Sequence, residues 1–203
     1  MSIQKALLAA VVLATGGGVF LQGAELVDLA EAIPGIRLDM RYAGPHNITG
    51  RAIYSDPRAR LRPEAAARLK RVQERLRRDG LQLVIWDAYR PQWAQEALWK
   101  AVPNANFVAP PRMGSRHTRG TSVDVGLADL QGNPVAVPTD HDVFSPLADH
   151  DFRDLPKAAA AHAEKLRQAM FQNGWSGVPA EWWHYDLRNW REFPPIKDSR
   201  EQD

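Results

Sequence analysis

Cysteine is absent from this chain of 203 residues. Its absence excludes disulfide bonds, thiolate metal sites, cysteine nucleophiles and the lipid anchor that bacteria attach to a cysteine. Any metal site must therefore be built from histidine and carboxylate side chains. The chain offers six histidines for such a site, so few combinations of ligands need to be considered.

The chain also lacks a large excess of charge of either sign. Its 26 Lys and Arg stand against 24 Asp and Glu, which leaves a net charge of +2. The pI of about 9.0 therefore does not indicate a nucleic-acid partner, and we expect none. Arginines crowd residues 58–80, but their spacing is typical of the solvated face of a helix. Length and composition predict one soluble globular domain.

Long hydrophobic runs are confined to the N-terminus, where residues 6–24 carry no charge behind Lys5. The run is broken by three glycines and is short for a spanning helix, which needs roughly 20 apolar residues. We interpret residues 1–24 as a secretory signal peptide, which predicts a periplasmic or otherwise exported protein without a stable membrane anchor after cleavage. A retained anchor, or a buried N-terminal segment in a cytoplasmic protein, are the alternatives.

Helices and strands alternate irregularly along the rest of the chain. Residues 63–78 have helical spacing of apolar positions, with Pro63 at the start and Gly80 past the end. Further helices are predicted from Pro91 and over 155–173, the latter capped by Asp154 and ended by Gly174. Strands are predicted at residues 81–89, 121–127 and 181–187. The fold class is therefore α+β, with a single domain over residues 25–195 and a disordered tail over 196–203.

Two histidines and one aspartate lie where they could share a metal. In "GSRHTRGTSVDVG" (114–126), His117 precedes Gly120, and Asp124 follows on the predicted strand. The glycine lets the loop turn back, so that both side chains can converge. His184 in "EWWHY" (181–185) would complete a set of three N and O ligands, which is how catalytic zinc is held with a fourth position left for water.

Two further residues suit catalysis at such a metal. Glu181 lies three residues before His184, a separation that puts regular strand neighbours on opposite faces. We therefore expect Glu181 at the junction of loop and strand, beside the water, as a general acid and base. Arg90 follows a predicted strand and precedes a helix that starts at Pro91, where side chains often enter a cleft. Its guanidinium would stabilise the negative charge that develops on the oxygen of a substrate carbonyl when the water attacks it.

Each pattern alone has an ordinary explanation. A histidine and an aspartate seven residues apart, or a glutamate three residues before a histidine, often occur by chance, and an arginine at a strand end is most often in a surface ion pair. Only their combination in a chain without cysteine favours a metal site. The remaining histidines show no comparable pattern, and we predict no site role for His46, His141, His150 or His162.

With these residues assembled, the chain resembles the D-alanyl-D-alanine dipeptidases, zinc enzymes that include the vancomycin-resistance dipeptidases. The family's Ser-x-His-x-x-Gly-x-x-x-Asp pattern is present from Ser115 to Asp124, its Glu-x-Trp-His pattern from Glu181 to His184, and the arginine of its Tyr-Arg-Pro stretch is Arg90. "DMRYAGPHNITG" and "LRPEAAARLKRVQ" also look like family segments, so the resemblance spans roughly residues 25–195.

The resemblance implies a central, mainly antiparallel sheet with flanking helices and one Zn²⁺ per chain held by His117, Asp124 and His184. It implies that Glu181 is the general base and that Arg90 stabilises the transition state. It further implies a small dipeptide substrate, with Asp142 facing its ammonium group and Ser115 helping to hold it. Asp140 lies close enough in sequence to compete with Asp142 for that role.

The expected reaction is hydrolysis of D-Ala-D-Ala to two D-alanines. One alternative is a zinc D,D- or L,D-carboxypeptidase or endopeptidase that trims longer peptidoglycan peptides with the same residues. Another is a zinc-containing domain that binds the cell wall without catalysis, against which an intact Glu181 and Arg90 count. The sequence does not give the oligomeric state.

Overall fold

The computed structural model describes residues 26–151 and 153–197 and builds them around a five-stranded sheet. The sheet order is β2-β4-β5-β7-β6, from strands Arg37–Leu38 (β2), Leu81–Asp87 (β4), Ser122–Asp129 (β5), Trp175–Val178 (β6) and Glu181–Leu187 (β7). Strand β2 runs parallel to β4, and the other three pairs are antiparallel. A separate antiparallel pair joins β1 (Val27–Asp28) to β3 (Arg60–Leu61). The predicted α+β class with a mainly antiparallel sheet is confirmed.

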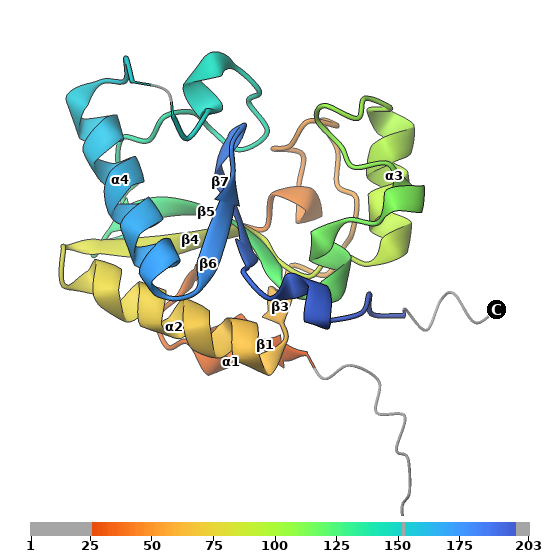
Figure 1. The fold of residues 1–203 in the computed structure, drawn as a ribbon, viewed down its shortest axis with the longest axis horizontal. Helices are drawn as coiled ribbons and strands as arrows, with labels where there is room; N and C mark the ends of the chain where they lie inside the picture. The colour runs from red at the N-terminus through yellow and green to blue at the C-terminus, as the bar shows by residue number, and fades with distance from the viewer. Residues whose placement is uncertain (1–25, 152, 198–203) are drawn as a thin grey trace, which may run out of the picture.

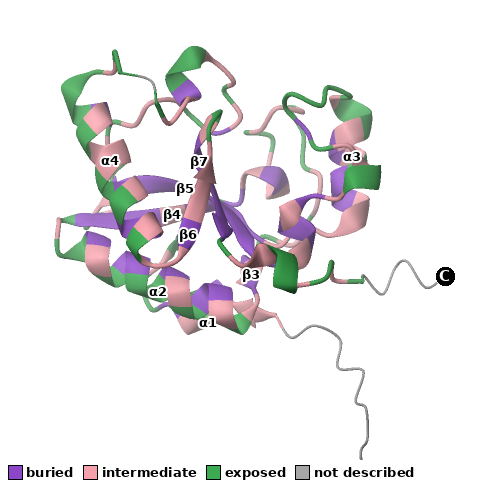
Figure 2. Cartoon of the chain, viewed as in Figure 1, coloured by how far each residue is buried: buried purple, intermediate pink, exposed green. Residues whose placement is uncertain are grey.

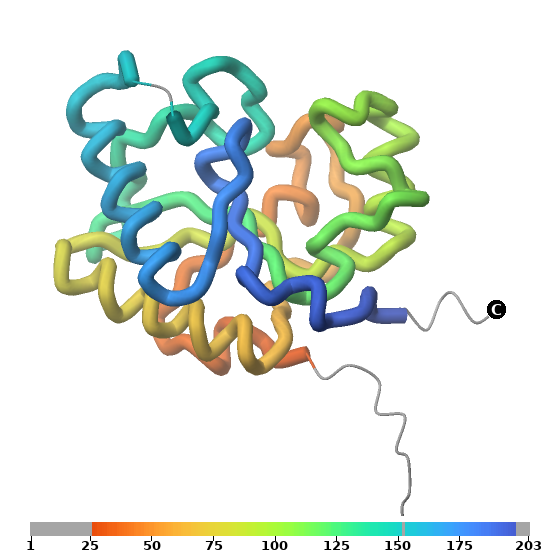
Figure 3. The backbone as a smooth tube through the Cα atoms, viewed as in Figure 1, coloured from red at the N-terminus to blue at the C-terminus, as the bar shows by residue number. Residues whose placement is uncertain are grey.

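Helices cover the sheet unequally. Helices α1 (Leu29–Ala32), α2 (Pro63–Arg77) and α4 (Lys157–Gln172) lie on one side of Figure 1, whereas α3 (Gln92–Ala101) lies across β7 from α4. Short 3-10 helices occupy Arg41–Ala43, Pro111–Met113, Arg116–Arg119, Pro146–Ala148 and Trp190–Glu192. The tube in Figure 3 shows the C-terminal part of the chain passing between these two groups of helices.

The core lies between the sheet and α2 and α4. The apolar positions of α2 that set its helical spacing, Ala65, Leu69, Val72 and Leu76, are all buried, as the sequence predicted. Figure 2 shows β4 and β5 as almost continuously buried strands. A second, smaller cluster is formed by Tyr42, Leu98 and Val108, and it fixes α3 beside the sheet. The candidate site lies on the sheet between these two clusters.

The third helix differs from the prediction at its start. Helix α4 begins at Lys157 after Pro156, and Asp154 makes no capping bond to it. Proline at position 156 fixes the local backbone, so the chain enters the helix two residues later than predicted. The predicted end is confirmed, because Gly174 follows the helix with a φ of +84°. Strand β6 comes directly after it and was not predicted.

The chain ends are only partly described. The predicted signal peptide at residues 1–24 and positions 198–203 lie outside the described residues. Ile196, which the sequence assigned to a disordered tail, donates its backbone N–H to the carbonyl of Thr118 at 2.8 Å. Within the described residues, no helix is both long and apolar enough to cross a membrane.

Candidate active site

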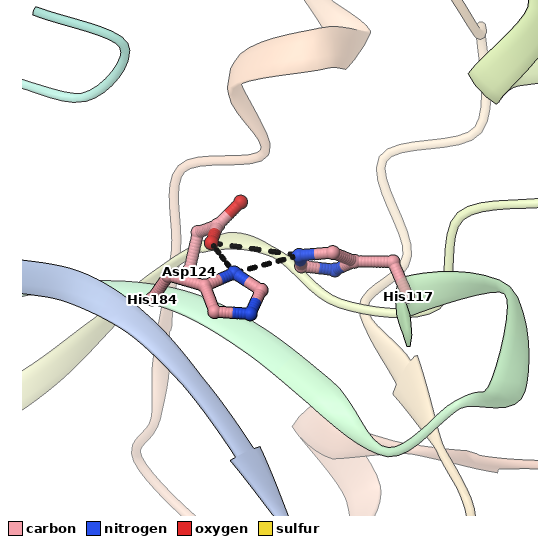
Figure 4. A group of neighbouring side chains, drawn as sticks. All are labelled: His117, Asp124 and His184. Atoms are coloured by element: carbon pink, nitrogen blue, oxygen red, sulfur yellow. Dashed lines mark hydrogen bonds and ion pairs between the residues drawn. The ribbon is translucent and has the colours of Figure 1, made fainter. Parts of the chain in front are cut away.

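Three predicted metal ligands converge on one point of the sheet. Asp124 on β5 is the direct cross-strand partner of His184 on β7, and Asp124 Oδ1 lies 2.9 Å from His184 Nδ1. His117 enters from the 3-10 turn before β5, and its Nε2 lies 3.2 Å from His184 Nδ1 and 3.5 Å from Asp124 Oδ1. Gly120 ends that turn in the left-handed region, with a φ of +68°. Figure 4 shows the three side chains pointing toward one another.

The three side chains suit a tetrahedral metal ion. Zinc binds imidazole nitrogen and carboxylate oxygen at about 2.0–2.2 Å, which places neighbouring tetrahedral ligands roughly 3.3 Å apart. The separations of 2.9, 3.2 and 3.5 Å between the facing atoms bracket this value. All three residues are buried, and they form the one group of this kind found among the described residues. They can therefore hold a single zinc ion and leave a fourth side open.

Both imidazoles are oriented by a partner behind them. His117 Nδ1 lies 2.7 Å from the carbonyl oxygen of Ala88, so Nδ1 carries the proton and Nε2 is free to bind a metal. His184 Nε2 lies 3.0 Å from Asp186 Oδ1, which leaves Nδ1 free in the same way. Asp186 is in turn paired with Arg116. Such partners fix the tautomer and ring orientation of metal-binding histidines.

Glu181 lies where the sequence placed it, at the start of β7. The register between β6 and β7 shifts between Gly177 and Val178, so Glu181 and His184 are not separated by a regular three-residue step of strand. As a result, Glu181 Oε2 lies 3.8 Å from His184 Nδ1. Burial raises the pKa of the Glu181 carboxyl above its ordinary value. A carboxylate with a raised pKa beside a metal site suits the acceptance and return of a proton.

Arg90 is held rigidly against the site. Its Nε and Nη2 contact Asp87 Oδ2 at 2.8 and 2.6 Å, and its Nη1 donates to Gln95 Oε1 at 2.9 Å. The guanidinium also stacks on the ring of Tyr42, and Nη2 lies 3.6 Å from Asp124 Oδ2. Burial, the largest single influence, would lower the pKa of Arg90, but the charges of Asp87, Tyr42 and Asp124 together outweigh it and the pKa is raised. The site therefore keeps a fixed positive charge.

Ser115 and Asp142 take different places around the cluster. Ser115 lines a cavity of about 680 Å³ together with Glu181 and His184, and its Oγ accepts the backbone N–H of His117 at 3.3 Å. Asp142 accepts hydrogen bonds from the Tyr42 hydroxyl at 3.0 Å and from the Ile48 N–H at 3.1 Å.

Asp142 also has a strained backbone, with a φ of +59°, the one positive value outside glycine among the described residues. Such strain is concentrated at functional sites. Asp140, the competing acid, is paired with Arg41 and its side chain is 60% exposed. The structure thus brings Asp142, rather than Asp140, into the buried network.

Four residues beside the candidate ligands were not singled out from the sequence. His141, predicted to have no site role, is buried with its Nε2 at 3.3 Å from Asp124 Oδ2. Asp87, Gln95 and Asp186 support Arg90 and His184. Asp87 and Asp186 did offer a signal, since each is a carboxylate inside an apolar strand. His141 and Gln95 offered none, because their contacts depend on loops that meet only in the folded chain.

Comparisons with known proteins agree with the motifs. A family model described as D-ala-D-ala dipeptidase matches residues 22–195. A D-alanyl-D-alanine dipeptidase of Escherichia coli K12 is 37% identical over 174 residues, covering 86% of this chain and 90% of that protein. One from Streptomyces coelicolor is 35% identical, covering 78% and 89%. The structure of the vancomycin resistance D,D-dipeptidase VanXYg with a D-Ala-D-Ala phosphinate analog matches at 18% identity, with a TM-score of 0.44 over 66% of this chain and 52% of that chain. The resemblance predicted from the motifs is confirmed, and the chain belongs to the D-alanyl-D-alanine dipeptidase family.

Proposed function

We propose that the protein is a zinc dipeptidase that hydrolyses D-Ala-D-Ala to two D-alanines, with one zinc ion per chain. The observation that carries the proposal is the buried cluster of His117, Asp124 and His184, whose His184 lines a cavity of about 680 Å³ together with Glu181. Its open side faces the acid that a hydrolase needs. Relatives named as D-alanyl-D-alanine dipeptidases across most of the chain length support the substrate.

Bound zinc would act as a Lewis acid toward the peptide carbonyl and make a water molecule easier to deprotonate. Glu181, 3.8 Å from the facing nitrogen of His184, accepts the proton of the attacking water and delivers it to the leaving amine. Arg90 is charged and fixed by Asp87 and Gln95, so its guanidinium donates hydrogen bonds to the carbonyl oxygen as negative charge develops there.

We assign different groups to the two parts of the dipeptide. Asp142 supplies a carboxylate for the ammonium group, within a network that also holds the Tyr42 hydroxyl. Ser115 lies on the cavity wall, where its hydroxyl can hold the other part of the dipeptide. Phe107, on the same wall, stacks on Phe144 with ring centroids 4.5 Å apart. This contact joins the loop of the cavity wall to the segment that follows Asp142.

A full set of catalytic groups also supports an enzyme over a domain that only binds the cell wall. The test is D-alanine release by the full-length protein from D-Ala-D-Ala and from a longer peptide that ends in D-Ala-D-Ala. We expect release from the dipeptide only, and loss of turnover by about 10²–10⁴-fold in Glu181→Gln. Release from the longer peptide would assign the trimming activity. Zinc binding without any turnover would contradict catalysis altogether.

A further inference from the structure

His141 is packed among three aromatic rings. Its ring centroid lies 5.5 Å from that of Tyr42, 5.6 Å from that of Trp86 and 5.9 Å from that of Trp183. Its side chain is 0% exposed. An imidazole packed in this way has little freedom to rotate, so the direction in which each ring nitrogen points is fixed by the fold.

Each ring nitrogen of His141 faces a carboxylate. Nε2 lies 3.3 Å from Asp124 Oδ2 within hydrogen-bonding geometry, whereas Nδ1 lies 3.5 Å from Asp142 Oδ2 and makes no hydrogen bond in the described part of the chain. An ionised carboxylate only accepts hydrogen bonds, so the nitrogen that bonds it must donate. His141 therefore presents its Nε2–H to Asp124.

The two oxygens of Asp124 consequently face different partners. Oδ1 lies beside the facing nitrogens of His117 and His184, at 3.5 and 2.9 Å. Oδ2 points the other way, toward His141 Nε2 at 3.3 Å and Arg90 Nη2 at 3.6 Å. The hydrogen bond from His141 and the positive charge of Arg90 thus hold Oδ2 on the side away from the two imidazoles. A carboxylate that is free to rotate can instead offer both oxygens to one metal ion.

We propose that His141 is a positioning residue that makes Asp124 a metal ligand through Oδ1 alone. The proposal rests on the proposed function, because it takes His117, Asp124 and His184 to be the zinc ligands. Catalytic zinc sites use three protein ligands and keep one position open. If both oxygens of Asp124 bound the zinc ion, the second oxygen would obstruct the open coordination position. The hydrogen bond from His141 prevents this and leaves the position accessible to substrate.

The experiment compares three substitutions in the full-length protein. His141→Phe fills the aromatic enclosure without a donor. His141→Gln can place its amide nitrogen near the position of Nε2, whereas the shorter His141→Asn places it near Nδ1. For each protein, the visible absorption of the Co²⁺-substituted form reports the number of ligands, because four-coordinate cobalt absorbs much more strongly than five-coordinate cobalt. Zinc content, kcat and KM for D-Ala-D-Ala are measured beside it.

We expect the wild type and His141→Gln to give the intense four-coordinate spectrum, and His141→Phe and His141→Asn to give the weaker five-coordinate one. The same two variants should lose kcat by about 10–100-fold, the usual effect of removing a group that orients a metal ligand. The matched control is His162→Phe on α4, where the imidazole contacts the carbonyl oxygen of Ala136, outside the carboxylate network. This control should keep both the spectrum and kcat.

A wild-type spectrum and kcat in His141→Phe would overturn the proposal, because the imidazole of His141 would then contribute only by packing. If His141→Phe does not fold, the Gln and Asn variants decide, since the same spectrum in both would equally overturn it. A wild-type chain that binds no Co²⁺ would instead refute the proposed function. Co²⁺ binding by the wild type therefore distinguishes a failure of the proposed function from a failure of the role given to His141.

Discussion

Side chains that hydrogen-bond to the candidate ligands determine how those ligands are oriented. Asp186 is fully buried, accepts from His184 Nε2 at 3.0 Å and from the Ser122 hydroxyl at 2.5 Å, and pairs with Arg116. Burial, the largest single influence, would raise the pKa of the Asp186 carboxyl, but His184, Ser122 and Arg116 together outweigh it and the pKa is lowered. The carboxylate therefore stays ionised and keeps Nδ1 of His184 turned toward Asp124.

We predict that Asp186→Asn weakens zinc binding by about 10–100-fold, because a neutral amide holds the imidazole less firmly than a carboxylate does. The zinc dissociation constant, measured by competition with a chelator, checks this. Asp151→Asn is the matched control, since Asp151 is exposed and its ion pair with Arg153 spans 3.5 Å at the surface. An unchanged dissociation constant in Asp186→Asn would show that Asp186 serves the fold and not the metal.

Sequence reasoning located the side chains that face the metal better than those behind them. His117 and Asp124 stand in one short motif and His184 in another, so the combination of the two motifs was sufficient to group them. His141 and Asp186 gain their roles from contacts across strands and loops. Such contacts join residues far apart in the chain, and single-sequence periodicity carries no information about them.

The elements around the sheet each position one part of the site. Strand β4 ends at Asp87, and α3 begins at Gln92, so Arg90 lies in the short connection between them. Gln95, on the first turn of α3, donates to the carbonyl oxygen of Ala109 at 2.7 Å and accepts from Arg90 at 2.9 Å. Helix α3 is thereby tied to both the guanidinium and the loop that forms the cavity wall.

We predict that Gln95→Met lowers kcat and kcat/KM together by about 10–100-fold, since a hydrogen bond to a charged group contributes roughly 1.5–3 kcal/mol. Steady-state kinetics on D-Ala-D-Ala measures the effect. Gln92→Met, on the same helix but bonded to the exposed Glu96, should leave the kinetics unchanged. A rise in KM alone would mean that Arg90 binds the ground state and does not act on the transition state.

Strand packing beneath the site depends on one glycine. A Cβ added to Gly126 on β5 would lie 2.2 Å from Cζ2 of Trp86, whose indole forms part of the enclosure around His141. We predict that Gly126→Ala lowers the free energy of unfolding by about 1–3 kcal/mol, because the buried indole must move. Gly44→Ala is the control, since a Cβ there meets nothing within 4 Å.

Urea unfolding of both variants checks the prediction. Equal stability of Gly126→Ala and the wild type would contradict it, because β4 and β5 would then accommodate the added Cβ without a loss of free energy of unfolding. The longer strands β4, β5 and β7 could be predicted from their apolar runs, whereas β6 was missed. The two-residue strands β1, β2 and β3 could not, because pairs this short have no periodicity and form only where the rest of the fold brings them together.

At the scale of the molecule, the site lies where two packed parts of one chain meet. The main core holds β5 and β7 with their metal-facing residues, and the smaller cluster around Leu98 holds α3 and the loop that carries Phe107. The order of helices and strands was sufficient to predict the α+β class. The cavity between the two parts could not be predicted, since it is lined by segments near residues 105–119 and 178–190 that approach only after folding.

The central claim is that one zinc ion, held by three side chains of this chain, supports hydrolysis of D-Ala-D-Ala. The most direct test is to strip the full-length protein with a chelator, add Zn²⁺ in small steps, and measure D-alanine release at each step. The account predicts that release rises linearly and levels off at one zinc per chain, and that His184→Ala shows no such rise. Full activity without added metal, or a plateau at two ions per chain, would contradict it.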